Sequence, residues 1–522
     1  MGSTFSGLNT MVKGLSANQL SLNTIGHNIT NANATGYSRQ SVNLGATDSE
    51  LAPSFYGEVQ VGTGVSATSI TRARDVYADK QYWSENSNQS YYDARQTNYS
   101  KVETIYNDSD STGMKSKLSA FWSSWQTLGT TSGADSYTNR VAVYETGTEA
   151  AQSINTAATS MQSQIKSQYD DMKLKVDRIN EITTQILKLN KNIVQTEANG
   201  SSSNDLRDSR DNLVDELSGY VKTSVTENSD GTYSVVSNGN TLVNGKSRLT
   251  LECDDKTATT NANYGVTDYA ITIKETGTIY DPGNGELKGM QDSIDEDKKS
   301  MDSLASMASF FLTTFNDQHK AGYGIDTANT TGTNFFGTDG TSYALDSTKT
   351  QVTAGGTTLS AIDTIKALSV NTALSSVSGK NLIATRGKTT SGAIEGTAGC
   401  ANAVLLSNLF NKPLTTTTTT GSVTVTTPVT TALGTISLND YYTGMMSSLG
   451  NKSDAINSKV TQQQDIMTAI TSNRQSTSGV NWDEELTNMI KFQQGYSASS
   501  RCLTTMDSML DKLINSTGMV GR

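Results

Sequence analysis

Both ends of the chain carry apolar residues at the alternating three- and four-residue spacing of a coiled coil. The apolar members of the N-terminal series, which Gln19 and Gly26 interrupt, are Phe5, Leu8, Val12, Leu15, Leu22 and Ile29. The C-terminal series consists of Leu486, Met489, Gln493, Tyr496, Leu503, Met506, Leu510 and Leu513, and Trp482, Ile490 and Phe492 widen its face. Each series predicts an amphipathic helix whose apolar face needs a partner.

Such helices can lie in the core of a globular domain or form a seam between helices. The N-terminal segment contains Gly7, Gly14 and Gly26, each of which costs a helix about 1 kcal/mol relative to Ala, so packing must stabilise it. Its stripe is also narrower than that of a usual core-facing helix. We therefore favour a helix-to-helix seam, within one chain or between chains.

Residues 154–193 hold a long heptad register, which as one helix would extend about 60 Å. Gln168 and Lys175 interrupt the series, whose apolar members are Ile154, Ala158, Met161, Ile165, Met172, Ile179, Ile182, Ile186, Leu189 and Ile193. Asn199 and Gly200 predict its end, Asn204 is a candidate N-cap for a second helix, and Gly219 ends that helix. The pattern predicts a helical hairpin.

The period changes to two between Val221 and Tyr280, where Asp230-Gly231, Asn238-Gly239 and Asn244-Gly245 are turn signals. Helical spacing returns from Glu286 to His319. Residues 324–434 are rich in Gly and Thr, include a low-complexity tract at 415–420, and hold one candidate helix at 401–411. We expect this last region to be an outer domain that is dispensable for a tube built by the chain ends, and its 415–420 tract has no side chains able to make a packed core.

These patterns predict an α+β multidomain fold. Coiled-coil-like terminal helices (residues 1–60 and 475–522) would form an inner domain, and residues 61–220, 286–323 and 435–474 would form a long helical-bundle layer. Residues 221–285 would be a small β domain and residues 324–434 a Gly/Thr-rich outer domain, both inserted. Hydrophobic residues make up only 34% of the 522 residues and the mean hydropathy is −0.44, which argues against one large core.

Charge and cysteine usage exclude several classes of partner. The net charge is −11, and no Lys/Arg cluster with interleaved aromatics is present, so we expect no nucleic-acid partner. No segment has the pattern of a cleaved signal peptide or a membrane span, so we expect neither a leader nor membrane attachment. Cys253, Cys400 and Cys502 show neither a metal-ligand spacing nor a disulfide framework, and we assign them no role.

The apparent chemical motifs all have structural interpretations. Residues 62–67 have the dinucleotide-binding form, but alternation continues after them, which favours a turn between strands. A calcium-loop start at 108–113 lacks the bidentate acid, because Ser119 occupies that position. Asp170-Asp171 and Glu484-Glu485 are expected on solvated helix surfaces. We predict no catalytic, cofactor-binding or metal-binding residues, and hence not an enzyme.

Residues 28–40, Asn-Ile-Thr-Asn-Ala-Asn-Ala-Thr-Gly-Tyr-Ser-Arg-Gln, resemble the segment that ends the first helix in bacterial flagellar rod, hook and hook-associated proteins. The Gly-Tyr-Ser-Arg-Gln ending is most similar to that of the hook-filament junction proteins, hook-associated protein 1. This chain has Ala34-Thr35 where the family usually has Thr-Pro. Further stretches with family resemblance are 61–65, 70–75, 81–83, 478–485, 489–496 and 505–513.

The resemblance implies a structural subunit of the extracellular flagellum, exported by the type III apparatus without cleavage and assembled as a ring between hook and filament. Implied partners are further copies of the chain, the hook protein, the second junction protein and an export chaperone at the C-terminal helix. Tyr37 and Arg39 would join the apolar residues of both terminal series in the assembly interface. Another axial flagellar protein, or an adhesin displayed on the same scaffold, remains an alternative.

Overall fold

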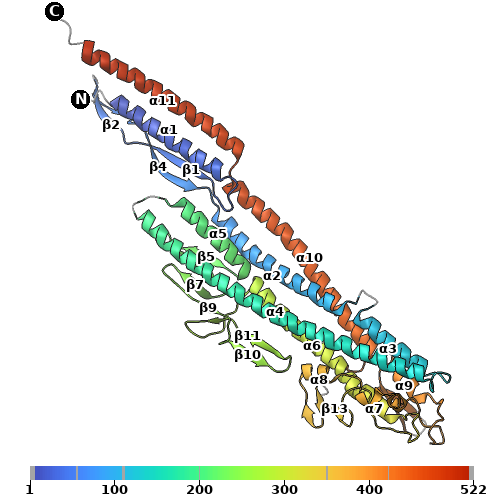
Figure 1. Ribbon diagram of the computed structural model, residues 1–522. Coiled ribbons are helices and arrows are strands. Elements are labelled where there is room, and N and C mark those ends of the chain that lie inside the picture. The colour runs from blue at the N-terminus through green and yellow to red at the C-terminus, as the bar shows by residue number, and fades with distance from the viewer. Residues whose placement is uncertain are drawn as a thin grey trace, which may run out of the picture.

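The computed structural model describes residues 6–54, 57–108, 112–198, 200, 202–347, 351–420 and 423–516. Phe5 of the N-terminal series lies outside the described residues. The molecule is elongated, with both termini at one end and long helices running to a mixed region at the other (Figure 1). Small sheets lie along one side of these helices (Figure 1). The predicted α+β class is confirmed.

The end that holds both termini is formed by two helices and two antiparallel strand pairs, which we call the terminal unit. β1 pairs with β4 and β2 pairs with β3, all antiparallel. Its elements are α1 (Ser6–Asn31), β1 (Gln40–Ala46), β2 (Glu50–Ser54), β3 (Gly57–Val61), β4 (Val65–Arg72) and α11 (Trp482–Ser516). The predicted turn at residues 62–67 is confirmed between β3 and β4, where Gly64 has a φ of 113° that favours glycine.

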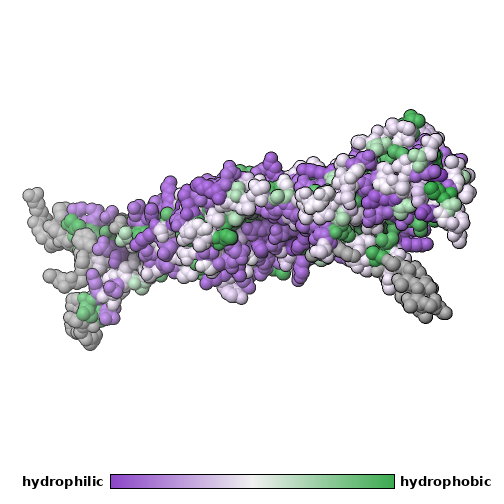
Figure 2. All heavy atoms as spheres, turned by 90° about the horizontal axis from the view of Figure 1, so that it is seen from below, coloured by the Kyte–Doolittle hydropathy of each residue, from purple (hydrophilic) through white to green (hydrophobic). Residues whose placement is uncertain are grey.

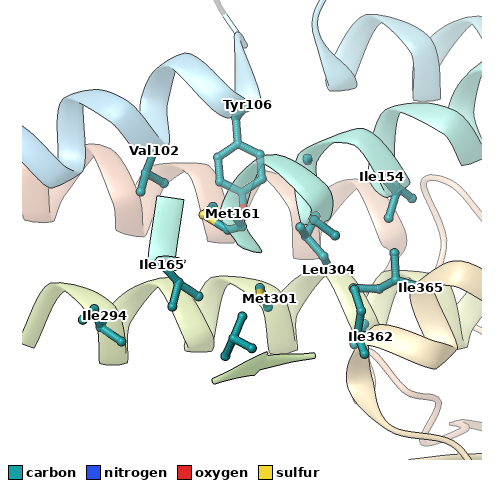
Figure 3. Packing of buried hydrophobic residues seen from close by; sticks show 14 of the residues in the cluster. Val102, Tyr106, Ile154, Met161, Ile165, Ile294, Met301, Leu304, Ile362 and Ile365 are labelled. Carbon is teal, nitrogen blue, oxygen red and sulfur yellow. The ribbon is translucent and has the colours of Figure 1, made fainter. Parts of the chain in front are cut away.

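Long helices form the body of the molecule, which we call the helical layer. They are α2 (Val76–Tyr106), α3 (Met114–Leu128), α4 (Tyr137–Glu197), α5 (Asn204–Tyr220), α6 (Glu286–Phe310) and α10 (Leu438–Ser478). The heptad register predicted within α4 is confirmed by full burial of Ile154, Met161, Ile165, Met172, Ile179, Ile182, Ile186 and Ile193. Figure 3 shows residues of α4 packed against residues of α2 and α6.

The polar interruption at Gln168 is a link between helices. Its amide donates to Asn98 Oδ1 of α2 at 3.0 Å and to Asp297 Oδ2 of α6 at 2.6 Å. Burial raises the pKa of Asp297 to about 6, although the amides of Asn98, Gln168 and Gln164 bond to its carboxylate and oppose the rise. Gln168, which interrupts the apolar pattern, therefore connects α4 with α2 and α6 through hydrogen bonds.

Two local predictions in this layer are wrong. The layer was expected to begin at residue 61, but strand β4 continues to Arg72 and the first long helix begins at Val76. Asn204 is not the N-cap of α5, because Ser203 occupies that position and Asn204 is the first helical residue. The Asn204 amide instead donates to Gln40 Oε1 at 3.0 Å, so a tertiary contact takes the side chain that could have capped the helix.

The predicted β segment forms three small antiparallel sheets beside α4. One has the strand order β5-β6-β7-β8, and β10 pairs with β11 and β9 with β12. The strands are β5 (Ser224–Glu227), β6 (Tyr233–Ser237), β7 (Asn240–Asn244), β8 (Ser247–Arg248), β9 (Leu251–Glu252), β10 (Ala258–Asn261), β11 (Val266–Tyr269) and β12 (Thr272–Ile273). The turn predictions are confirmed, since Gly231, Gly239 and Gly245 all have positive φ.

The end farthest from the termini mixes short helices and strands. Helix α6 continues through a π-helical turn, Phe311–Phe315, into α7 (Asn316–Ala321). There follow β13 (Tyr343–Leu345), β14 (Val352–Ala354), β15 (Thr357–Thr358), α8 (Ala361–Ala367), two 3₁₀ turns (Thr372–Leu374 and Gly379–Leu382), α9 (Ala401–Asn408), β16 (Thr415–Thr420) and β17 (Val423–Pro428). The single predicted helix at 401–411 corresponds to α9.

Residues 324–434, which composition predicts as an outer inserted domain, contribute apolar residues to the core of the helical layer. Phe335 and Phe336 are buried within an aromatic cluster that belongs to the helical layer. The ring centroid of Phe335 lies 5.8 Å from that of Phe121 and 5.6 Å from that of Trp125. The few apolar residues of this region thus complete a core that the helices begin. Figure 2 shows a mostly hydrophilic surface along the helical layer, with hydrophobic residues more frequent at this far end.

Candidate assembly interface

The terminal helices α1 and α11 pair with each other in antiparallel orientation. Three contacts define a constant register: Gly7 faces Met506, Gly14 faces Ser499, and Asn18 faces Gly495. At the far end of the pair, the Asn28 amide donates to Glu485 Oε2 at 3.1 Å. The expectation of coiled-coil-like terminal helices is confirmed, and their seam lies within one chain.

Glycines on α1 and α11 lie in this seam. A methyl group on Gly14 would lie 3.6 Å from Ser499 Oγ, an ordinary contact, while one on Gly7 would approach Met506 Cε to 2.7 Å. Small residues let the backbones of the two helices approach, so part of the helix-propensity cost of glycine is offset by the contact it allows. The weakness of the isolated N-terminal helix is therefore linked to its pairing.

On α11, the predicted apolar series lies largely along the seam. Its half-buried members follow the three-four spacing that faces α1, and they are Met489, Phe492, Tyr496, Leu503, Met506 and Leu510. Leu486 is 45% exposed and lies outside the seam, whereas Leu513, 58% exposed, continues the seam spacing beyond the part of α1 that the structure describes. Trp482 and Ile490 are also exposed, at 48% and 60%. The helix thus keeps an apolar ridge in addition to its seam.

On α1, the predicted series does not provide the buried face. The buried residues of the helix are Ala17, Ser21, Thr24, Ile25 and Asn28. The predicted residues Leu8, Leu15, Leu22 and Ile29 are only half-buried, and Val12 is 43% exposed. Counting about 100° per residue, their stripe is centred more than about 90° away from the buried face. Small and polar side chains fill the intramolecular contact, and the apolar stripe remains open.

The open apolar positions of the two helices lie on one face of the pair. Val12 and Leu15 on α1, and Leu486 and Ile490 on α11, are each displaced from the seam in the same rotational sense along their own helix. Because the helices are antiparallel, equal senses of displacement lead to the same side. The terminal unit therefore presents an apolar strip that its own chain leaves partly uncovered.

The segment with the flagellar signature forms the joint between α1 and the helical layer. Gly36 has a φ of 72°, and a methyl group there would lie 1.6 Å from Asn212 Oδ1, so the turn requires glycine against α5. The Tyr37 hydroxyl donates to Asn28 Oδ1 at 2.8 Å and lies 2.9 Å from His27 Nδ1. Burial and nearby carboxylates, Asp205 first, raise the pKa of Tyr37. Tyr37 therefore braces the end of its own helix.

The next residues of the signature bind carboxylates on two other helices. Ser38 donates its backbone N–H and its hydroxyl to Asp208 of α5, at 2.9 and 2.8 Å. Arg39 makes ion pairs with Glu484 at 2.9 Å and Glu485 at 2.8 Å, at the start of α11. Burial alone would lower the pKa of Arg39, but hydrogen bonds and charge interactions with these two carboxylates outweigh burial and raise the pKa.

The expectation that Glu484-Glu485 is merely solvated is wrong for Glu485. Its side chain is 2% exposed and binds both Arg39 and Asn28. Asp170 and Asp171 are exposed, as predicted. Sequence reasoning also missed Asp205 and Asp208 of α5. Their carboxylates accept hydrogen bonds from the Gln40 amide and the Ser38 hydroxyl. Two features of the sequence could have indicated this contact: the aspartates spaced three or four apart on α5, and the Arg-Ala-Arg of residues 72–74, whose charges are complementary to them.

The described residues offer no grouping of three or more His, Cys, Asp or Glu side chains that could hold a metal ion. Within the same part of the chain, no helix is long and apolar enough to cross a membrane. Cys253 is buried, Cys400 is half-buried and Cys502 is exposed, and all three are free thiols. Burial raises the pKa of Cys253 to about 11, which keeps this thiol protonated and unreactive at neutral pH.

Comparison with known proteins now adds to this geometry. The chain is 32% identical over 558 aligned residues to flagellar hook-associated protein 1 of Bacillus subtilis, and the alignment covers 100% of both chains. This chain belongs to the flagellar hook-associated protein 1 family. Hook-associated protein 1 of Escherichia coli is 28% identical to it, with 97% of this chain and 99% of that relative covered.

Two family models agree with that membership. The flagellar hook-associated protein FlgK helical domain matches residues 99–336, and the flagellar basal body rod FlgEFG protein C-terminal model matches residues 471–516. The structure of the flagellar hook junction protein FlgK from Burkholderia pseudomallei superposes with a TM-score of 0.57 at 16% identity. That superposition covers 76% of this chain and 100% of the other, and it supports the fold.

Proposed function

We propose that this chain is a structural subunit of the bacterial flagellum that forms the junction between hook and filament. The observation that carries the proposal is the full-length identity with hook-associated protein 1 of Bacillus subtilis, 32% over 558 residues. Another axial flagellar protein is not favoured, because that identity spans the whole chain. A displayed adhesin or enzyme is not favoured either, since the chain covers its relatives without an additional region.

The terminal unit supports assembly with further copies of the same chain. Its apolar strip, carried by Leu8, Val12, Leu15, Leu486 and Ile490, is half-buried or exposed in the single chain. Burying a Leu or Ile side chain contributes about 1.5 to 3 kcal/mol, so an adjacent subunit that covers the strip gains stability. In a closed ring or a helical array the same contact recurs at every subunit.

The remaining partners follow from the position of the junction. The hook protein and the second junction protein would contact the two sides of the ring. An export chaperone would bind the end of α11, where Met509, Leu513 and Ile514 are 58% to 69% exposed in the free chain. Export through the type III apparatus without a cleaved signal, to the outside of the cell, completes the proposal.

Electron microscopy of flagella from a strain lacking this gene tests the function. We expect hooks without filaments and flagellin secreted into the medium, with filaments restored by the wild-type chain. A complementing chain with Leu15→Asp should be secreted but should not restore filaments, whereas the exposed polar neighbour Ser16→Asp should restore them. Normal filaments in the deletion strain would contradict the proposal.

A further inference from the structure

The described part of the terminal unit does not share the large hydrophobic cluster of the molecule. The large hydrophobic cluster of the molecule extends through the helical layer, the sheets and the far end, and it includes no described residue of α1, β1–β4 or α11. The chain crosses between the two parts at residues 73–75 and at residues 479–481. Their relative direction therefore depends on the polar side chains at these crossings and on the hydrogen bond that the Arg39 backbone N–H donates to the Ser478 carbonyl at 2.9 Å.

A buried ionic network occupies this position, and we call it the ionic joint. Arg72 Nη1 lies 2.6 Å from Asp208 Oδ1 and 2.8 Å from Asp211 Oδ2. Arg74 binds both carboxylate oxygens of Asp79, through Nε at 2.8 Å and Nη2 at 3.1 Å. The side chains of the joint are between 2% and 17% exposed, and they are Arg72, Arg74, Asp79, Asp208, Asp211, Asp215 and Arg474.

Within the joint, arginines of the terminal unit and its linker bind aspartates of the helical layer. Arg72 ends β4 and Arg74 follows it, whereas Asp79 belongs to α2 and Asp208 and Asp211 to α5. Arg474 of α10 binds Asp79 at 2.8 Å and Asp215 at 2.7 Å. It therefore links α2 and α5, the two helices whose aspartates bind Arg72 and Arg74. The signature segment adds Ser38, which donates its hydroxyl to Asp208.

We infer that this ionic joint, and not apolar packing, sets the direction in which the terminal helices leave the helical layer. Arg72 and Asp208 are then positioning residues that hold the apolar strip at the angle an assembled ring needs. Buried ion pairs add little net stability but are strongly directional, and losing one partner leaves a charge uncompensated. The role in the ring rests on the proposed function, whereas the orientation of the terminal helices in the free chain does not.

The free chain can be tested by measuring a distance across the joint. Spin labels are placed at two exposed positions, Gln494 on α11 and Lys188 on α4, through unnatural amino acids, so the native cysteines stay in place. Wild-type chain should give a narrow distribution of label separations by pulsed electron resonance. Arg72→Gln should broaden that distribution severalfold and raise amide exchange at residues 65–73, while exchange in α4 stays unchanged.

Arg207→Gln is the matched control. Arg207 also binds two carboxylates, Glu197 at 2.8 Å and Glu227 at 2.5 Å, with a side chain 19% exposed against 12% for Arg72. Both of its partners lie outside the terminal unit, so the label distribution should stay narrow. A narrow distribution in Arg72→Gln, or equal broadening in Arg207→Gln, would overturn the inference.

Two further arms keep the test decisive. If Arg72→Gln does not fold, the paired variant Arg72→Gln/Asp208→Asn removes one charge of each sign; it should fold with a broad distribution, and a narrow one would overturn the inference. In cells, Arg72→Gln should be secreted but restore at least tenfold fewer filaments than Arg207→Gln. Broad labels with normal filaments would refute the role in assembly alone, and the deletion-strain phenotype reports on the proposed function separately.

Discussion

The stability of the far end should depend on pH through a single histidine. His319 of α7 is fully buried, with Nδ1 2.8 Å from the Thr333 carbonyl and Nε2 3.0 Å from the Ala384 backbone N–H. Because Ala384 donates to Nε2, the proton of the neutral ring must be on Nδ1, which donates to Thr333. Protonating Nε2 would break the bond from Ala384. Burial lowers the pKa of His319 to about 4, and the positive charges of Arg140 and Lys320 add to the effect.

The sign and size of the effect follow from linkage. The pKa is lowered in the folded state from its ordinary value of 6.5, so the stabilisation is complete above that value and is lost as the pH falls toward 4. Between about pH 7.5 and about pH 5, this one residue should reduce the free energy of unfolding by about 2 kcal/mol. The full reduction, reached below about pH 4, is about 3 kcal/mol.

Urea unfolding followed by tryptophan fluorescence measures this change, because Trp125 lies 6.2 Å from the His319 ring. Carboxylates titrate in both wild type and His319→Gln, so the difference between their pH dependences isolates the histidine. His27→Gln is the control, and it also assigns the two histidine signals in a nuclear magnetic resonance titration. A His319 signal with a midpoint near 6.5, or equal losses of stability in wild type and His319→Gln, would refute the reasoning.

Four other variants, in three experiments, test the seam and the far end. Gly14→Ala should stabilise the paired α1 by up to about 1 kcal/mol, measured by thermal melting; a lower melting temperature would show that the seam has no room for a methyl group. Leu503→Asp should raise amide exchange in α1 of the free chain, whereas Leu15→Asp should not, since only Leu503 lies in the seam. Replacing residues 324–434 with a Gly/Ser linker should lower the melting temperature and increase binding of a hydrophobic dye, because the aromatic cluster loses its cover; unchanged melting would contradict this.

Periodicity correctly predicted the elements whose buried face consists of apolar residues. The heptad register of α4 was predicted correctly because a long helix packed against other helices and small sheets must bury a continuous stripe, which here extends from Ile154 to Ile193. The same reasoning misplaced α1, whose apolar stripe is not its buried face. Small residues such as Ala17 and Ser21 bury readily but give no hydrophobic signal, so the intramolecular face had no pattern to detect.

The joint and the far end were missed for a different reason. Glu485 was predicted to be a solvated surface residue because its partners are hundreds of positions away in the sequence. Asn28 is separated from it by 457 positions. In residues 324–434, a few apolar side chains such as Phe335 complete a core supplied by other segments, and composition averages over them. Charge pairing across the chain and shared cores are properties of the assembled fold, and local pattern does not contain them.

The antiparallel pairing of α1 with α11 also has a consequence for the order of folding. The contacts between Gly7 and Met506 and between Asn28 and Glu485 have a very large sequence separation, because nearly the whole chain lies between the two partners. Such contacts raise the contact order of the fold. During vectorial synthesis the first helix has no partner until the last residues emerge, although the helices and sheets between them can already fold. Its open, glycine-containing segment must wait as an unpaired chain end. Helix α1 is thus among the last elements of this chain to reach its final structure.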